Sequence, residues 1–233
     1  MDKYKNKFFS ILGDSISTLD GYNPPEHLVY YEGYHKFETD VFCIEDTWWG
    51  QVIESLGGNL LANDSFSGSL LSKHKSCFIP SYGCSDERTS ALGKDGISPD
   101  VIFLFMGTND WGMKMKLYPD AEGGEDLSVF SVAYEKTIEK LRRNYPSAEI
   151  WCFTLPINRH DPRTDAVAES RPPIEEYCRV IEGCAERNGC GIVDLYSAAL
   201  DYDTVDGFHP TAKGMKTLAD ATIKCIADQY NKN

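Results

Sequence analysis

Apolar residues follow two alternating patterns along the chain, and each pattern predicts one type of element. Short, continuous apolar runs are typical of buried parallel strands, and they occur at residues 8–15, 59–65, 99–107, 149–155 and 190–195. Apolar residues at helical spacing alternate with these runs, at residues 47–56, 86–92, 127–144, 174–188 and 212–229. This alternation predicts an α/β fold in which right-handed crossovers place helices on both faces of a parallel sheet.

Three segments between the predicted elements fit neither pattern. Residues 16–47 are rich in Tyr and Phe and are interrupted by Gly and Pro, which predicts a long surface excursion. We expect this excursion either to shape the pocket or to cap the edge of the sheet. Residues 111–126 and 158–173 predict two further loops. No internal repeat or linker interrupts the pattern, so the chain is expected to form one domain over residues 1–233.

The first predicted strand ends abruptly in Gly13-Asp14-Ser15. Open α/β sheets carry their ligands at the carboxyl ends of the strands, so Ser15 is expected where chemistry takes place. Gly13 permits a tight turn, Asp14 can accept hydrogen bonds from nearby backbone N–H groups, and Ser15 can open a helix. Ser15 is then either a nucleophile or only the N-cap of the next segment, and for an isolated tripeptide the cap is the more common role.

Two later segments bring further polar residues to the same edge. The strand at 99–107 is followed by Asn109, and both Asp206 and His209 lie on the turn before the last helix. A serine becomes nucleophilic only beside a base, the base needs an orienting carboxylate, and the oxyanion needs fixed hydrogen-bond donors. These residues together with Ser15 meet all three requirements, so the sequence favours nucleophilic catalysis.

The charge and hydropathy of the chain exclude several classes of partner. The formal net charge of −13 opposes binding to phosphate backbones, and no basic run offsets it, so nucleic acid is not an expected partner. No stretch approaches the roughly 20 apolar residues of a membrane span, and the first residues lack the apolar region of a signal peptide. A cytoplasmic location is therefore expected, with an exported form left open. Oligomeric state does not follow from these features.

Cysteine and aspartate spacing argue against a metal site. The eight cysteines contain no Cys-x-x-Cys pair and no zinc-finger spacing, so free thiols are expected in a reducing compartment. A Cys77–Cys84 loop disulfide is the alternative if the protein is exported. Asp194, Asp201, Asp203 and Asp206 flank a strand and a loop without a calcium-binding pattern and are expected to be solvated acids rather than metal ligands. Neither a metal nor a cofactor is expected.

Four short blocks, taken together and in order, resemble the SGNH, or GDSL-type, esterase and lipase family over nearly the whole chain. The blocks are Gly13-Asp14-Ser15, Asn63 through Gly68, Gly107-Thr108-Asn109-Asp110 and Asp206-Gly207-Phe208-His209-Pro210. The resemblance implies a three-layer α/β/α sandwich around a five-stranded, flavodoxin-like sheet. Two positions depart from the family pattern, because Ile16 replaces the leucine of the fuller first block and Ser65 stands where a glycine is common.

The resemblance also implies a role for each matching residue. Ser15 is implied to be the nucleophile, His209 the general base and then acid, and Asp206 its orienting partner. The backbone N–H groups of Ser15 and Gly68, with the side-chain amide of Asn109, are implied to form the oxyanion hole. A Gly-x-Ser-x-Gly elbow, which an α/β-hydrolase requires, does not occur around Ser15.

The expected function is a serine esterase that acts on a small-molecule ester through an acyl-enzyme. No long apolar helix could serve as a lid, which favours short acyl groups such as acetyl. Several loop residues combine aromatic and polar groups, which favours a polar alcohol such as a carbohydrate. These loop residues are Tyr22, Tyr30, Tyr31, Trp111, Asn158, Arg159 and His160. The candidate substrate-binding residues are Asp14, Trp111, Tyr22 and His160. The alternatives are a lipase, a lysophospholipase or an acyltransferase at the same site, or a non-catalytic flavodoxin-like binding module, although no glycine-rich phosphate loop is present.

Overall fold

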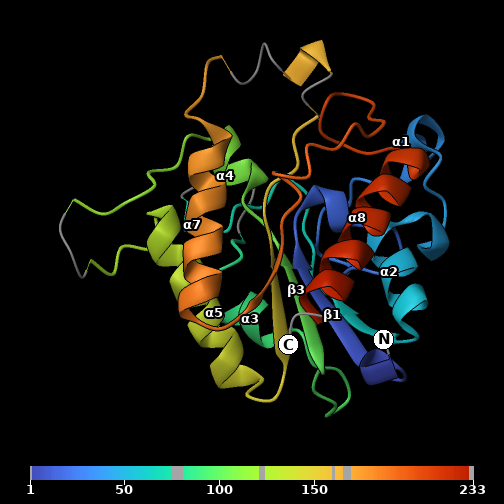
Figure 1. Cartoon of the computed structure of the whole chain (residues 1–233), viewed down its shortest axis with the longest axis horizontal. Coiled ribbons are helices and arrows are strands. Elements are labelled where there is room, and N and C mark those ends of the chain that lie inside the picture. The colour runs from blue at the N-terminus through green and yellow to red at the C-terminus, as the bar shows by residue number, and fades with distance from the viewer. Residues whose placement is uncertain (1, 75–80, 121–123, 159–160, 165–168, 231–233) are drawn as a thin grey trace.

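A five-stranded parallel sheet lies at the centre of the protein (Figure 1). This computed structural model describes residues 2–74, 81–120, 124–158, 161–164 and 169–230. The strands are β1 (Phe8–Gly13), β2 (Asn59–Asn63), β3 (Val101–Phe105), β4 (Glu149–Phe153) and β5 (Gly191–Val193). Their spatial order, β2-β1-β3-β4-β5, is that of flavodoxin-like sheets, so the predicted fold class is confirmed.

Helices cover both faces of this sheet, which gives the predicted three layers. One face is covered by α2 (Trp48–Leu56) and α8 (Ala212–Tyr230), and the other by α5 (Phe130–Asn144) and α7 (Ile174–Arg187). Figure 1 shows these two pairs on opposite sides of the strands. A shorter helix, α3 (Asp86–Ser90), packs beside α5.

The alternation of side chains along β3 explains why its sequence is apolar throughout. Phe103 and Phe105 belong to the core beneath α2 and α8, whereas Ile102 and Leu104 belong to the core beneath α5 and α7. A central parallel strand is buried on both faces, so neither face tolerates polar residues. Gly13 at the end of β1 lies opposite Phe105 at the end of β3, and the segments that follow both strands therefore leave the sheet at one edge.

The structure differs from the sequence-based predictions in four local features. The excursion at 16–47 contains a helix, α1 (Gly33–Thr39), and a 3₁₀ turn, η3 (Ile44–Asp46). The segment after β3 begins with α4 (Thr108–Gly112), where a loop was expected from residue 111. Elements this short complete barely one or two turns, so they carry too little apolar periodicity for a pattern to reveal them. The five strands and the helices α2, α5 and α7 are each one to four residues shorter than predicted, whereas α8 extends one residue further.

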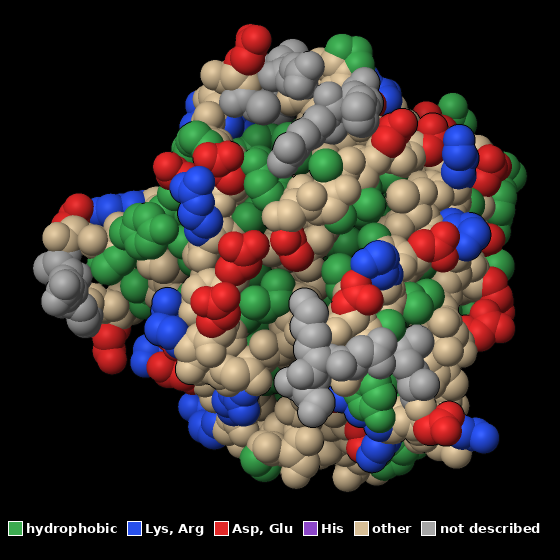
Figure 2. Space-filling model, in the orientation of Figure 1, with side chains coloured by type: hydrophobic (Ala, Val, Ile, Leu, Met, Phe, Trp, Pro, Cys, Tyr) green, Lys and Arg blue, Asp and Glu red, His purple; other side chains and the backbone are tan. Residues whose placement is uncertain are grey.

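The surface mixes both signs of charge. Figure 2 shows Lys and Arg side chains standing among Asp and Glu over the face that it presents. Within the described ranges, no helix combines the length and the hydropathy that crossing a membrane requires.

Candidate active site

Ser15 directly follows the turn that ends β1. Asp14 caps a single 3₁₀ turn, η2 (Ser15–Ser17), because its Oδ1 accepts from the backbone N–H of Ile16 at 3.1 Å. Asp14, rather than Ser15, is therefore the N-cap of η2, and the Ser15 hydroxyl is available for another partner. Ser15 is only 7% exposed, so its hydroxyl lies at the floor of a depression rather than on an open surface.

Gly13 is required at this turn because the loop after β2 approaches it closely. A Cβ atom at this position would lie 2.6 Å from Ser65 Oγ and 2.8 Å from Ser17 Cβ, closer than real side chains approach. The hydroxyl of Ser65 in turn donates to Asn63 Oδ1 at 2.6 Å. Ser65, which departs from the family pattern, is thus accommodated by a bond within its own loop.

Ser15, His209 and Asp206 form one continuous series of hydrogen bonds. His209 Nε2 lies 2.9 Å from Ser15 Oγ, and His209 Nδ1 lies 2.6 Å from Asp206 Oδ2. The other carboxylate oxygen, Asp206 Oδ1, accepts from the backbone N–H groups of Phe208 at 3.0 Å and His209 at 2.8 Å. Such a series can hold the imidazole with its free nitrogen toward the hydroxyl and accept the hydroxyl proton.

The loop that carries His209 is closed by backbone hydrogen bonds before α8 begins. The N–H of Val205 donates to the carbonyl of His209 at 3.1 Å, and the N–H of Thr211 donates to the carbonyl of Asp203 at 3.0 Å. Asp206 and His209 therefore lie three residues apart on one tight turn, as the sequence predicted. This closure sets the direction in which the imidazole leaves the backbone.

The two carboxyl groups nearest Ser15 have pKa values shifted in opposite directions. Burial raises the pKa of Asp14 to about 6, and the N–H of Ile16 and the charge of His209 compensate only in part. Burial also acts to raise the pKa of Asp206, but the hydrogen bond and charge of His209 outweigh it and lower that pKa to about 2. Asp206 is consequently an anion at neutral pH, as an orienting partner of His209 must be.

Tyr30 packs face to face on the imidazole of His209. The two ring centroids are 3.7 Å apart with an interplanar angle of 7°, and His35 stacks on the opposite face of Tyr30 at 4.5 Å. The backbone N–H of Tyr30 donates to Thr18 Oγ1, which itself donates to the carbonyl of Ser15 at 2.8 Å. The excursion thus contacts both the serine turn and the histidine, and its aromatic residue covers the imidazole.

Asn109 joins the segment after β3 to the loop after β2. Its Nδ2 donates to the carbonyl of Ser69 at 3.0 Å, which leaves the second amide hydrogen available. Asn109 and Ser15 line the same cavity. Gly107 makes this geometry possible, because its φ of +133° is a backbone conformation that other residues rarely adopt. Gly68 precedes Ser69, and its N–H has no acceptor among the residues that the structure describes.

A buried ion pair anchors the loop that contains Gly68. Arg88 is 1% exposed, and its Nε donates to Asp64 Oδ2 at 2.7 Å. The same guanidinium donates to Ser69 Oγ at 2.7 Å and to the carbonyl of Gly13 at 3.1 Å. One side chain on α3 therefore connects the end of β1 with both ends of the loop. Burial raises the pKa of Asp64 more than the charge of Arg88 lowers it.

Asp110 anchors the next part of that loop from the opposite direction. Its carboxylate is fully buried and accepts from the backbone N–H groups of Leu71 at 2.8 Å and Ser72 at 2.9 Å. Burial raises its pKa, and these backbone hydrogen bonds lower it only in part. The helix α4 and the loop after β2 are thus attached to each other by both Asn109 and Asp110.

A cavity of about 170 Å³ lies beside Ser15. Its lining residues are Ser15, Ile16, Thr108, Asn109, Trp111, Gly112, Arg171, Phe208 and His209. Trp111, a predicted substrate-binding residue, belongs to this wall, and its indole Nε1 donates to the carbonyl of Pro172 at 2.8 Å. Asp14, by contrast, lies buried behind Ser15 and does not line the cavity, although the sequence analysis placed it among the substrate-binding residues.

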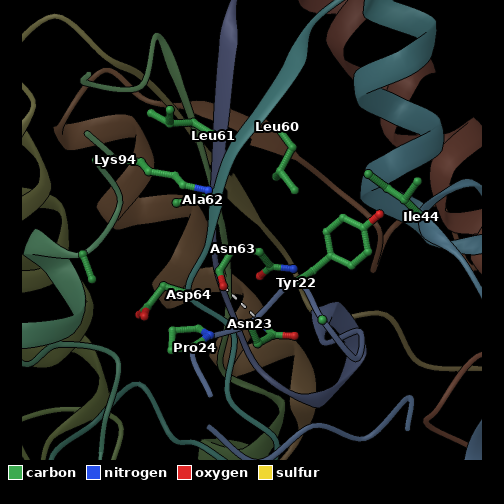
Figure 3. Close-up of a pocket in the computed structure, with 13 residues that line it drawn as sticks. Tyr22, Asn23, Pro24, Ile44, Leu60, Leu61, Ala62, Asn63, Asp64 and Lys94 are labelled. Atoms are coloured by element: carbon green, nitrogen blue, oxygen red, sulfur yellow. Dashed lines mark hydrogen bonds between the residues drawn. The ribbon is translucent and has the colours of Figure 1, made fainter. Parts of the chain in front are cut away.

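Tyr22 lies in a different hollow, away from Ser15. This second cavity, of about 610 Å³, follows the outer edge of β2, and Figure 3 shows Tyr22 in it beside Leu60 and Ile44. Tyr22 packs edge-on against Trp49, with ring centroids 5.7 Å apart. The expected contribution of Tyr22 to the cavity at Ser15 is therefore not observed, because the chain turns toward β2 directly after η2.

Of the remaining predicted loop residues, Tyr31 and Asn158 do not line this cavity. Tyr31 is buried and donates to the carbonyl of Pro210 at 3.0 Å, and Asn158 Nδ2 donates to the carbonyl of Tyr202 at 2.8 Å. His160 and Arg159 lie outside the described residues. Of the aromatic residues of the excursion, Tyr30 and Tyr31 pack against other parts of the protein, whereas Tyr34, Phe37 and Phe42 are exposed.

The functional roles of three residues were not found from the sequence, although Tyr30 was named among the loop residues expected near the site. Arg171 lines the cavity, Tyr30 stacks on His209, and Arg88 anchors the loop after β2. Arg171 lies in a segment whose sequence is polar and proline-rich, and Tyr30 is one of several aromatic residues in its excursion. Arg88 lies on a helix of only five residues. None of these positions carries a local signal that separates it from its neighbours.

The described part of the chain contains no cluster of three or more His, Cys, Asp or Glu side chains that could hold a metal ion. Cys84 is buried. Its suggested partner, Cys77, lies outside the described residues, so the Cys77–Cys84 pairing stays a prediction.

Comparisons with known proteins agree with this geometry. The family model for GDSL-like lipase/acylhydrolase matches residues 7–226. A solved structure from Bacteroides ovatus, described as a GDSL-like lipase, is 26% identical with a TM-score of 0.75, over 98% of this chain and 100% of that one. Another from Bacteroides uniformis is 27% identical with a TM-score of 0.75, over 96% of each chain. No curated protein matches.

A fungal structure shares the fold at lower identity. It is a carbohydrate esterase family 2 enzyme with a carbohydrate-binding domain, from Corynascus thermopiles. It is 20% identical with a TM-score of 0.60, over 97% of this chain and 67% of that one.

Proposed function

Because the chain belongs to the GDSL-like lipase/acylhydrolase family and is a carboxylic ester hydrolase, we propose that it is a serine esterase that forms an acyl-enzyme on Ser15. The observation that carries this proposal is the series of hydrogen bonds from Ser15 Oγ through His209 to Asp206, at 2.9 and 2.6 Å. We also propose that the chain forms one hydrolase domain.

In the proposed reaction, Ser15 Oγ attacks the acyl carbon of the ester while His209 Nε2 accepts the hydroxyl proton. Asp206 holds the Nδ1–H and stabilises the imidazolium that forms. The oxyanion accepts hydrogen bonds from the amide of Asn109 and from the N–H groups of Ser15 and Gly68. His209 then donates its proton to the leaving alcohol. Water attacks the acyl-enzyme by the same route in reverse, which releases the acid and restores Ser15.

The proposed acyl group is short, with acetyl as the preferred case. The cavity of about 170 Å³ is smaller than the roughly 300–1,000 Å³ of sites that enclose drug-sized ligands. Its apolar wall consists of Ile16, Trp111 and Phe208. Extending the acyl chain beyond a few carbons would force it out of this cavity and into solvent.

The proposed alcohol is polar, such as a carbohydrate. Asn109 supplies a polar group on the cavity wall, and the Corynascus thermopiles structure that shares the fold is a carbohydrate esterase. Tyr22, Tyr30 and Tyr31 do not line the cavity. Of the aromatic loop residues that the sequence suggested for substrate binding, Trp111 is the one on its wall.

Kinetics with 4-nitrophenyl acetate, butyrate and octanoate test the esterase and its acyl preference, and acetate release from acetylated sugars tests the alcohol. We expect kcat/KM to fall from acetate to octanoate, and Ser15→Ala to lose at least about 10⁴-fold in kcat. Ser90→Ala, which alters an exposed serine on α3, is the matched control and should retain full activity. Turnover that survives in Ser15→Ala would contradict the mechanism, and a preference for octanoate would contradict the short acyl group.

A further inference from the structure

The cavity beside Ser15 contains a cation that the proposed chemistry does not use. Arg171 lines its wall, and the Arg171 Cζ lies 5.1 Å from the ring centroid of Trp111. Its Nε donates to the carbonyl of Gly112 at 2.9 Å. These two contacts hold the guanidinium against α4, yet they use only one of its five N–H groups.

Arg171 differs from most other arginines of the protein because it has no carboxylate partner among the described residues. Ion pairs with Asp or Glu are formed by Arg88, Arg143, Arg163, Arg179 and Arg187. The chain contains 36 acidic side chains, so carboxylates are abundant. Keeping a half-buried guanidinium without a counter-ion costs desolvation free energy, which a bound anion would offset.

Thr108 also lines this cavity and carries a second hydrogen-bond donor. Thr108 Oγ1 is buried and has no hydrogen-bond partner in the part of the chain that the structure describes. The rings of Trp111 and Phe208, whose centroids are 6.0 Å apart, form the apolar wall beside it. A guanidinium and a hydroxyl next to apolar walls suit a carboxylate, because low polarity nearby strengthens a charge-assisted hydrogen bond.

We propose that this cavity recognises a carboxylate carried by the ester substrate, and that Arg171 is the residue that determines this specificity. The inference rests on the proposed esterase function and narrows its substrate class. Arg171 binds the carboxylate through its free N–H groups while Ser15 attacks the ester bond, and no proton moves at Arg171. The carboxylate belongs either to the acyl group or to the alcohol.

Matched pairs of esters separate these two sources. For the acyl arm, mono-4-nitrophenyl succinate is compared with 4-nitrophenyl butyrate, which has the same chain length without the charge. For the alcohol arm, 3-acetoxybenzoate is compared with 3-acetoxybenzamide, which carries a neutral amide. Wild-type protein, Arg171→Gln and Arg179→Gln are assayed with all four esters. Arg179 is an exposed arginine on α7, so its variant has the same change in net charge away from the cavity.

In at least one arm, the wild type should prefer the anionic ester, and Arg171→Gln should lower kcat/KM for that ester by about 10- to 100-fold, as expected for a charge-assisted hydrogen bond. The neutral partner of the pair should change by less than about twofold, and Arg179→Gln should behave like the wild type. Equal losses for both esters would overturn the inference, because they indicate that Arg171 only supports α4. A neutral preference in both arms, or equal effects of both variants, would also overturn it.

Failure of the proposed function gives a different result. If Ser15→Ala hydrolyses the neutral esters as fast as the wild type, the esterase mechanism itself is wrong. If hydrolysis of the neutral esters depends on Ser15 while Arg171→Gln leaves the anionic esters unaffected, only the carboxylate inference fails.

Discussion

The two sides of the proposed catalytic site are held in place by different forces. On the oxyanion side, the loop after β2 is fixed by the Arg88–Asp64 pair, whose side chains are 1% and 4% exposed. On the base side, the side chains of His209 and Asp206 are 21% and 44% exposed. Backbone N–H groups and the ring of Tyr30 position them instead.

The two sides should therefore respond differently to mutation. Removing one partner of a buried ion pair leaves the other charge uncompensated in the interior, which is strongly unfavourable. Asp206 is partly exposed, so solvent screens part of the stability that its charge contributes, and its removal affects the reaction more than the stability. A mutation on the oxyanion side is therefore expected to reduce both activity and stability, whereas a mutation on the base side should mainly reduce activity.

The largest expected effect is on the base side, in Asp206→Asn. The amide still accepts from the two backbone N–H groups, but it no longer favours the Nδ1–H form of His209, so kcat should fall about 10⁴-fold. The free energy of unfolding at pH 7, from urea denaturation, should fall by about 1–2 kcal/mol, because the charge of Asp206 is stabilised in the folded protein and solvent screens part of that effect. Asp220→Asn, on the exposed face of α8, is the control for both measurements. An Asp206→Asn variant that is strongly destabilised but keeps the wild-type kcat would contradict the expected difference between the two sides.

The oxyanion side should show the opposite balance in Arg88→Met. Removing the guanidinium leaves Asp64 buried without its partner, which should destabilise the protein by about 3–5 kcal/mol. Arg143→Met breaks an exposed pair with Asp86 and should cost less than about 1 kcal/mol. Urea denaturation measures the free energy of unfolding of both variants. In Arg88→Met, kcat per folded molecule should also fall, because the loop after β2, which Asn109 contacts, loosens. Wild-type stability in Arg88→Met would show that the buried pair is not needed.

The two carboxyl groups beside Ser15 should contribute to stability with opposite dependence on pH. The pKa of Asp14 is raised from 3.8 to about 6, so its contribution is present below about pH 4 and is lost as the pH rises through 6. The pKa of Asp206 is lowered to about 2, so its contribution is present above about pH 4 and is lost as the pH falls toward 2.

Asp14→Asn tests the first of these two dependences. Between pH 4 and pH 7, the variant should gain up to about 3 kcal/mol in the free energy of unfolding relative to the wild type. Urea denaturation at intervals of one pH unit measures this difference. If the difference stays constant over the whole range, then Asp14 titrates normally in the folded protein.

The smallest expected effect is that of Tyr30, which we infer to be a positioning residue for His209. Tyr30→Leu removes the ring face that stabilises the imidazolium, so kcat should fall about tenfold and the acidic limb of the kcat/KM profile should move to lower pH by up to about one unit. Tyr30→Phe keeps the ring and should match the wild type. A uniform loss at every pH, without movement of the limb, would assign Tyr30 a structural role only.

The sequence by itself determined the arrangement of the sheet and helices and the edge at which the polar blocks meet. Buried parallel strands are apolar throughout and amphipathic helices follow a 3.6-residue period, so both leave local patterns. Because parallel strands end at one edge, Ser15 and Asn109 could be placed together without coordinates. Asp206 and His209 are three residues apart, so their contact is local as well.

Only the tertiary structure decided which side chains surround these groups. Tyr22 and Tyr30 lie eight residues apart in the same aromatic excursion, yet one faces the edge of β2 and the other covers His209. No local feature of the sequence indicates that Arg88 forms a buried ion pair or that Arg171 lines the cavity. Their partners are distant in the sequence, and these contacts depend on the path of irregular loops, which no hydrophobic period records.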